Sequence, residues 1–102
     1  MIKHTLYIGL NDKDTKHQEI GTLDAFKICT NIFTSTTGGA TISEATGIYT
    51  HDSGEIVREK SLRCEVFGAD TETIKKAADQ IKTALNQEAI AIEISEVNSF
   101  FY

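Results

Sequence analysis

The amino-acid sequence predicts an α+β domain with a ferredoxin-like β-α-β-β-α-β order, in which two helices cover one face of a four-stranded antiparallel sheet. Two observations predict this fold. Segments with apolar residues at every second position alternate with segments whose apolar residues recur every three or four positions. The 102 residues also contain no Pro and no low-complexity linker, so we expect one domain spanning residues 1–102.

The first half of the chain predicts a strand, a loop and a helix. Residues 2–10 alternate between apolar and polar side chains, which is typical of a strand with one buried face. The polar residues 11–18 predict a loop. We then expect Thr22 to cap a helix that ends at Gly38-Gly39. Its apolar stripe is Ala25, Phe26, Cys29, Ile32 and Phe33.

The second half predicts a hairpin, a helix and a final strand. Residues 40–50 and 55–67 read as strands joined by a tight turn at 51–54. Gly47 interrupts the first of them, which marks a bulge or a close approach to the backbone. Asp70 or Thr71 is expected to cap the next helix, and Asn86 to end it. Residues 88–97 predict the fourth strand.

Composition and charge exclude several classes of protein. The formal net charge is −5, which disfavours non-specific binding to nucleic acid or to an anionic membrane. No signal-peptide core and no 18-residue apolar run occurs, so we expect a cytoplasmic location. Cys29 and Cys64 lie on apolar faces and are expected to be buried, reduced thiols. No ligand cluster has zinc spacing, and we expect neither a metal nor a cofactor.

The strand at 55–67 and the aromatic residues supply the candidate ligand-binding groups. Arg58 and Lys60 share one side of the strand and Arg63 takes the other, so they form either a self-neutralising strand or a set of phosphate contacts. Tyr49 or Phe101 is the candidate stacking residue. Because the sheet face without helices and the aromatic tail 100–102 are both uncovered in a monomer, we expect a homo-oligomer.

Five stretches of this sequence together resemble a small, largely uncharacterised family of bacterial and phage domains. The stretches are residues 6–10 (LYIGL), 39–42 (GATI), 47–49 (GIY), 54–61 (GEIVREKS) and 86–90 (NQEAI). The resemblance implies the ferredoxin-like fold and oligomerisation, and it supplies no established catalytic residues. The Pro-free, Asn-, Lys- and Thr-rich composition is also similar to that of prophage proteins. Some small phage proteins of this size are sponges that sequester nucleotide immune signals such as cyclic ADP-ribose derivatives.

Three functions from different classes follow as hypotheses. The first is a non-enzymatic, oligomeric protein that binds a small anionic nucleotide and sequesters it, without cleavage, as a phage sponge. The second is a small cofactor-free enzyme on a dimeric α+β barrel, with His51, His4 or Glu59 as its base. The third is an inhibitor that binds a protein partner through the hairpin or a sheet edge. DNA and RNA are not expected as partners, because the neighbours of Tyr7 on the third strand are Glu59, Arg63 and Glu65 instead of stacking aromatics, and the net charge is negative.

Overall fold

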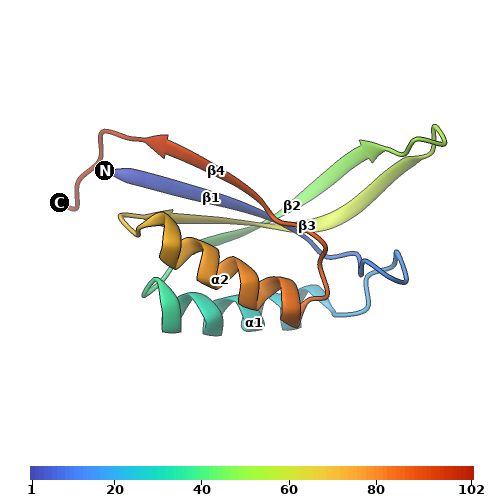
Figure 1. The fold of residues 1–102 in the computed structure, drawn as a ribbon, viewed down its shortest axis with the longest axis horizontal. Helices are drawn as coiled ribbons and strands as arrows, with labels where there is room; N and C mark the ends of the chain where they lie inside the picture. The colour runs from blue at the N-terminus through green and yellow to red at the C-terminus, as the bar shows by residue number, and fades with distance from the viewer.

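The structure is a computed structural model that describes residues 1–102, and it contains four strands and two helices. In chain order they are β1 (Ile2–Gly9), α1 (Thr22–Thr36), β2 (Thr41–Thr50), β3 (Ile56–Phe67), α2 (Thr71–Ala84) and β4 (Ala91–Glu96). Both helices lie on the same face of the sheet (Figure 1). Neither helix is long and apolar enough to cross a membrane.

The four strands form one antiparallel sheet in the order β2-β3-β1-β4. This arrangement confirms the predicted ferredoxin-like fold. Tyr7 pairs with Arg63 of β3 on one side and with Ala91 of β4 on the other, so β1 is a central strand. The register places Tyr7 and Arg63 on the face opposite to the helices, as the alternation predicts.

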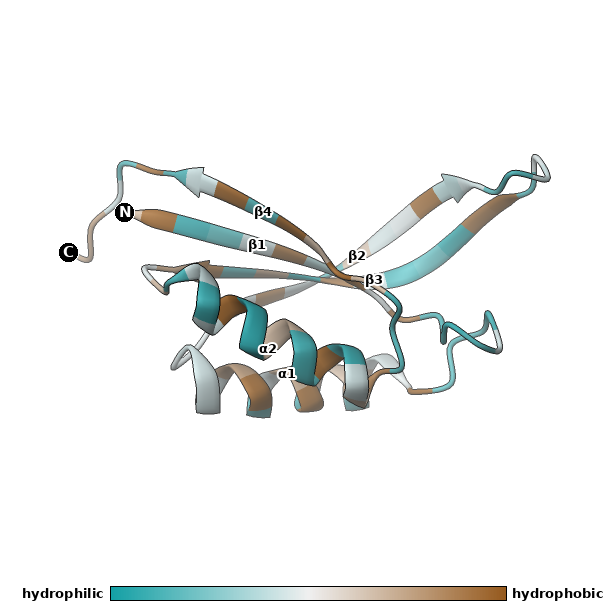
Figure 2. Ribbon diagram, in the orientation of Figure 1, coloured by the Kyte–Doolittle hydropathy of each residue, from teal (hydrophilic) through white to brown (hydrophobic).

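Fourteen buried hydrophobic residues between the sheet and the helices form one core. Its largest member is Phe33 of α1, which packs with Leu6 and Ile8 of β1 and with Ile74 and Ile81 of α2. Figure 2 shows hydrophilic ribbon on the exposed side of α2, in the loop after β1 and near the hairpin tip. The predicted apolar stripes face the sheet apart from Phe26, which is 39% exposed, and burial of the other members is the main stabilising contribution to the fold.

The structure confirms the predicted N-terminal cap of α2 and contradicts that of α1. The Asp70 side chain accepts a hydrogen bond from the Thr73 N–H and caps α2, as expected. At α1 the cap residue is Gly21, and no side chain bonds there, so the prediction for Thr22 was wrong. Thr22 is the first helical residue, and its hydroxyl accepts a bond from the Gln18 side-chain amide.

The β2–β3 hairpin extends beyond the rest of the sheet. Pairing of β1 with β3 ends at Gly9 and Ser61, whereas β2 and β3 remain paired as far as Thr50 and Ile56. In Figure 1 this overhang projects at the end of the molecule opposite to the two termini. The overhang, the loop at 11–18 and the segment after α2 therefore meet at one end of the sheet.

Candidate functional site

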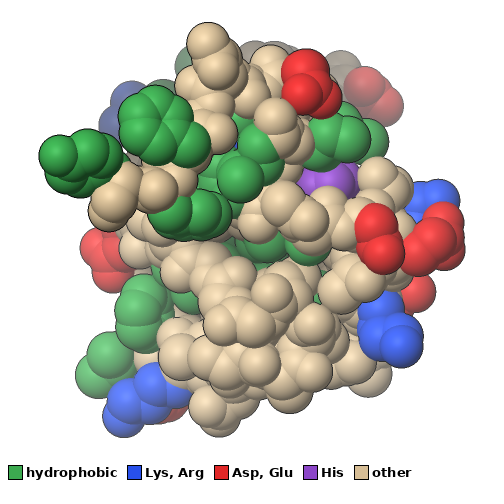
Figure 3. Space-filling model, turned by 90° about the vertical axis from the view of Figure 1, so that its left-hand side faces the viewer, with side chains coloured by type: hydrophobic (Ala, Val, Ile, Leu, Met, Phe, Trp, Pro, Cys, Tyr) green, Lys and Arg blue, Asp and Glu red, His purple; other side chains and the backbone are tan.

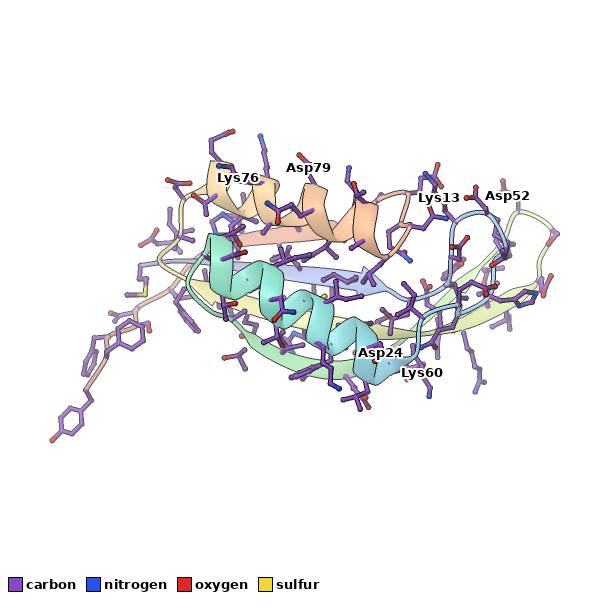
Figure 4. The ribbon with its side chains drawn as sticks, turned by 90° about the horizontal axis from the view of Figure 1, so that it is seen from below. Lys13, Asp24, Asp52, Lys60, Lys76 and Asp79 are labelled. Atoms are coloured by element: carbon purple, nitrogen blue, oxygen red, sulfur yellow. The ribbon has the colours of Figure 1, made fainter.

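A pocket of about 740 Å³ occupies the angle between the overhanging hairpin and the loop after β1. We call it the hairpin pocket. Figure 4 shows Lys13 and Asp52, from the loop and the hairpin, at this same end of the molecule. Its lining is mostly polar and comes from three segments: residues 11–13 and 16–18, residues 49, 51 and 55–59, and residues 87–89.

The Glu59 carboxylate is the best-positioned charged group of the hairpin pocket. It is half-buried and accepts a hydrogen bond from the Asn11 backbone N–H at 3.1 Å. A Cβ atom built on Gly9 would lie 2.6 Å from Glu59 Oε1, and one built on Gly47 would lie 3.7 Å from Glu59 Cγ. Gly9 on the neighbouring strand therefore leaves the space that the carboxylate occupies, whereas Gly47 is in ordinary contact with the stem of this side chain.

Aromatic and cationic side chains line the pocket around Glu59. The rings of Tyr49 and His51 meet edge to face, with centroids 5.4 Å apart. Arg58, Lys13 and Lys16 add positive charge, and none of these three forms an ion pair within the chain. The pocket thus combines an aromatic surface, free cations and one fixed carboxylate, which suits a ligand with a ring system, hydroxyl groups and a carboxylate.

The loop that forms one wall of the pocket is tied to the end of α2. Asn86, which has a positive φ of 49°, donates from its side-chain amide to Asp12 Oδ2 and Asp14 Oδ2, each at 2.9 Å. The Asn86 amide, followed by the backbone N–H groups of Thr15 and Asp14, lowers the pKa of Asp12. The loop at 11–18 therefore has a defined conformation in the structure.

The residues proposed from the sequence for ligand binding do not all come together. Tyr49 and Arg58 line the hairpin pocket. Lys60 lies on the same strand face as Arg58 but in a separate, smaller hollow that Thr22 also lines, and Figure 4 shows it beside the start of α1. Arg63 lies on the opposite face and pairs with Glu65 at 3.6 Å.

The aromatic tail lies at the other end of the molecule. Phe101 is 84% exposed, and Phe100 and Tyr102 are exposed as well. Figure 3, which looks at the end where the chain termini lie, shows hydrophobic side chains gathered there. Within one chain Phe101 is therefore separated from Tyr49 and Arg58 by the length of the sheet.

The three candidate bases of the enzyme hypothesis fall in different places. Glu59 and His51 line the hairpin pocket. His4 is fully buried beneath the helices, where its Nε2 lies 3.0 Å from Thr71 Oγ1, and it does not line the hairpin pocket. Thr5 is also fully buried, but on the open face of the sheet, between its cross-strand neighbours Glu65 and Glu93.

Asn11 and Gln87 are pocket residues that the sequence analysis missed. Gln87 donates a hydrogen bond to the Asn11 backbone, and Asn11 donates one to Glu59. Asn11 acts through its backbone N–H, which carries no signal of its own in a sequence. Gly47 did carry a usable signal, because a glycine within a strand indicates a close approach, and the groups near it are Ser61 Oγ at 3.3 Å and Glu59 Cγ at 3.7 Å. No three His, Cys, Asp or Glu side chains gather as metal ligands in the structure.

Comparison with solved structures shows which proteins share this fold. A phage SAM lyase in complex with S-methyl-5'-thioadenosine superposes with a TM-score of 0.70 at 22% identity, covering 93% of this chain and 80% of the other. A phage SAM lyase in the apo state covers 99% of this chain and 91% of the other, with a TM-score of 0.66 and 19% identity. CutA1 from Pyrococcus horikoshii has a TM-score of 0.63 at 13% identity and covers 99% of this chain and 87% of the other.

No family model and no curated protein sequence matches this chain. The structural likeness corrects one hypothesis from the sequence. A non-enzymatic phage sponge was expected, but the solved structures that share the fold over nearly the whole chain include a lyase, an enzyme that cleaves SAM. The expectation of a non-cleaving sponge was therefore wrong, since it depended on composition and size and not on any motif.

Proposed function

We propose that this protein is an enzyme that binds S-adenosylmethionine in the hairpin pocket and cleaves it to S-methyl-5'-thioadenosine. A sulfonium needs no cofactor for this step, because its positive sulfur takes up the electron pair of the broken carbon–sulfur bond. The carboxylate oxygen of the methionine portion attacks the γ-carbon as the bond to sulfur breaks, so the neutral thioether leaves, and the amino-acid fragment leaves as a lactone without addition of water. The fold shared with phage SAM lyase and the composition of the hairpin pocket support the proposal.

The position of Glu59 is the observation that carries this proposal. Its carboxylate is held by the Asn11 N–H in a space left by Gly9, so it is oriented before any ligand arrives. The sulfonium loses its charge as the bond breaks, so a carboxylate placed at sulfur would stabilise the substrate more than the transition state. We therefore assign Glu59 to the ribose hydroxyls, from which it accepts hydrogen bonds.

The other pocket groups fit the remaining parts of the substrate. The Tyr49 ring, which is in edge-to-face contact with His51, offers a stacking surface for adenine. Arg58, with Lys13 nearby in the pocket lining, offers donors to the carboxylate of the methionine portion. The substrate is an intracellular metabolite, so the cytoplasm is the proposed site of action.

A second copy of the chain completes the proposed enzyme. The overhang exposes Ile48 and Ile56, at 63% and 65%, on the strand face that they share with Arg58, where the hairpin extends beyond the helices (Figure 1). A pair of exposed Ile side chains on an unsupported hairpin is typical of an interface between copies. Burial of this hairpin against a second copy would enclose the hairpin pocket and exclude water from the substrate.

The test is incubation of the purified protein with S-adenosylmethionine and identification of the products by mass. We expect S-methyl-5'-thioadenosine and an amino-acid fragment. Glu59→Gln should reduce kcat/KM by about 10- to 100-fold, since hydrogen bonds to a charged group contribute ~1.5–3 kcal/mol. The control is Glu55→Gln, which changes a carboxylate in the same pocket lining whose side chain bonds to nothing in the chain. Absence of thioether product would refute the proposal.

A further inference from the structure

A chain of two hydrogen bonds leads from the end of α2 to the Glu59 carboxylate. The Gln87 side-chain amide donates to the Asn11 carbonyl oxygen at 2.9 Å and to the Leu85 carbonyl oxygen at 3.2 Å. The Asn11 N–H in turn donates to Glu59 Oε2 at 3.1 Å. Gln87 therefore fixes the position of Asn11, and Asn11 in turn fixes the Glu59 carboxylate.

The orientation of the Asn11 N–H needs such support, because β1 pairing has already ended there. The last ladder-type bond on this side is from the Leu10 N–H to the Lys60 carbonyl oxygen, at 3.0 Å. Beyond it the chain turns into the loop, and the backbone of Lys13 bonds to the Asn86 carbonyl oxygen at 3.0 Å. The end of α2 thus replaces the missing sheet contacts of residues 11–13.

Asn86 supplies the second half of this support. Its left-handed backbone, with φ of 49°, turns the chain so that its own amide reaches Asp12 and Asp14 while Gln87 reaches Asn11. Asn tolerates this conformation better than most residues other than Gly. Two adjacent amides after α2 therefore fix both ends of the 11–14 segment.

We propose that Gln87 is a positioning residue, which holds the Asn11 backbone by its carbonyl oxygen, so that the Asn11 N–H orients the Glu59 carboxylate and sets the affinity of the pocket for the nucleoside. The inference rests on the proposed function for its effect on catalysis, whereas the hydrogen-bond chain itself can be measured without any substrate. Gln87 is assigned no contact with the reacting atoms. If Glu59 binds the ribose equally in substrate and transition state, displacing it raises KM and leaves kcat nearly unchanged.

The experiment compares Gln87→Met with the wild-type protein and with Gln80→Met, the same change on the exposed face of α2. Methionine keeps the length of glutamine and removes the donor. The first readout is the backbone amide proton of Asn11 in the NMR spectrum, which a carboxylate acceptor moves downfield. We expect it to move upfield in Gln87→Met, in the direction given by Glu59→Gln, and to stay unchanged in Gln80→Met.

The second readout is kinetic and separates positioning from a general loss of structure. In Gln87→Met we expect KM for S-adenosylmethionine to rise about tenfold while kcat stays within about twofold. If Gln87→Met does not fold, Gln87→Glu takes its place, because the carboxylate keeps the shape of the amide and cannot donate to the Asn11 carbonyl oxygen. The same upfield movement of the Asn11 amide is expected there.

Each result decides the inference separately from the proposed function. An Asn11 amide that does not move in a folded Gln87→Met protein overturns the positioning role, whether or not the protein cleaves its substrate. An amide that moves with no rise in KM also overturns it. If the wild-type protein forms no thioether, the proposed function fails, while the amide shift still decides whether Gln87 orients Glu59.

Discussion

Replacing Gly9 with alanine tests the assignment of Glu59 with little risk to the fold. The new Cβ would lie 2.6 Å from Glu59 Oε1 and 2.8 Å from the carboxyl carbon. The atoms it meets are the far end of a flexible side chain, so the carboxylate moves and the backbone stays in place. Gly9→Ala should therefore remove the bond from the Asn11 N–H to Glu59 and leave the sheet intact.

The expected cost in stability is small and can be worked from these contacts. Loss of a hydrogen bond to a charged, half-buried group costs about 1.5 kcal/mol, at the lower end of the range. Replacing a strand glycine with alanine stabilises the fold by about 0.5–1 kcal/mol, because the unfolded chain has less conformational entropy to lose. The net loss is therefore about 0.5–1 kcal/mol. A domain with a typical free energy of unfolding, about 5–15 kcal/mol, stays folded after such a loss. Its Tm should fall by less than about 8 °C.

The assay is calorimetric titration with S-methyl-5'-thioadenosine, supported by thermal melts and by the NMR signal of the Asn11 amide. We expect Gly9→Ala to weaken binding about 10- to 100-fold. Gly47→Ala is the matched control, because its Cβ meets Ser61 Oγ at 3.3 Å, a hydroxyl that can rotate, and leaves the carboxylate in place. A folded Gly9→Ala protein that binds the thioether within twofold of wild type would refute the reasoning.

The remaining predictions concern the stability of the fold. Asp70→Ala removes the cap of α2 and should lower Tm by about 4–8 °C at neutral pH. The Thr73 N–H lowers the pKa of Asp70, so the carboxylate stabilises the fold above its ordinary pKa of 3.8, and the gap between variant and wild type should close as the pH falls below that value. Burial raises the pKa of Cys29 to about 11 and that of Cys64 to about 12. Ellman's reagent should therefore titrate no thiol in the native protein at pH 8 and two after unfolding, and stability should decline as the pH rises from about 9 towards 12, where the unfolded thiols ionise first. Fast labelling of the native protein would contradict the burial of these thiols. So would a stability that does not change as the pH rises from about 9 towards 12.

Most of the fold could be predicted from the sequence because its signals are local. The alternation of residues 2–10 and the stripe around Ile74, Ala77 and Ile81 each place an apolar face without knowledge of the partner. The error at Thr22 arose because the chain enters α1 through Gly21, and the Thr22 hydroxyl bonds to a side chain instead of a helix N–H. The cap at Asp70 was predictable, since its partner is three residues away.

The candidate site could be predicted only in part. Tyr49, Arg58 and Glu59 were identifiable because they lie close together on one hairpin. Lys60 and Arg63 were grouped with Arg58 on the same strand, but Lys60 lies in a separate, smaller hollow outside the hairpin pocket, and Arg63 is on the open face and pairs with Glu65. Charge on a strand does not say which neighbouring element completes a site.

The sequence by itself determined the order of elements, the buried faces and the charged hairpin, because these depend on side-chain periods of two and 3.6 residues. The tertiary structure decided that Glu59 is a fixed carboxylate. Its partner Asn11 is 48 positions away, and Asn11 is held by Gln87, 76 positions further along the chain. These contacts arise from the register of β1 on β3 and from the turn after α2, and no local pattern encodes the meeting of three distant segments.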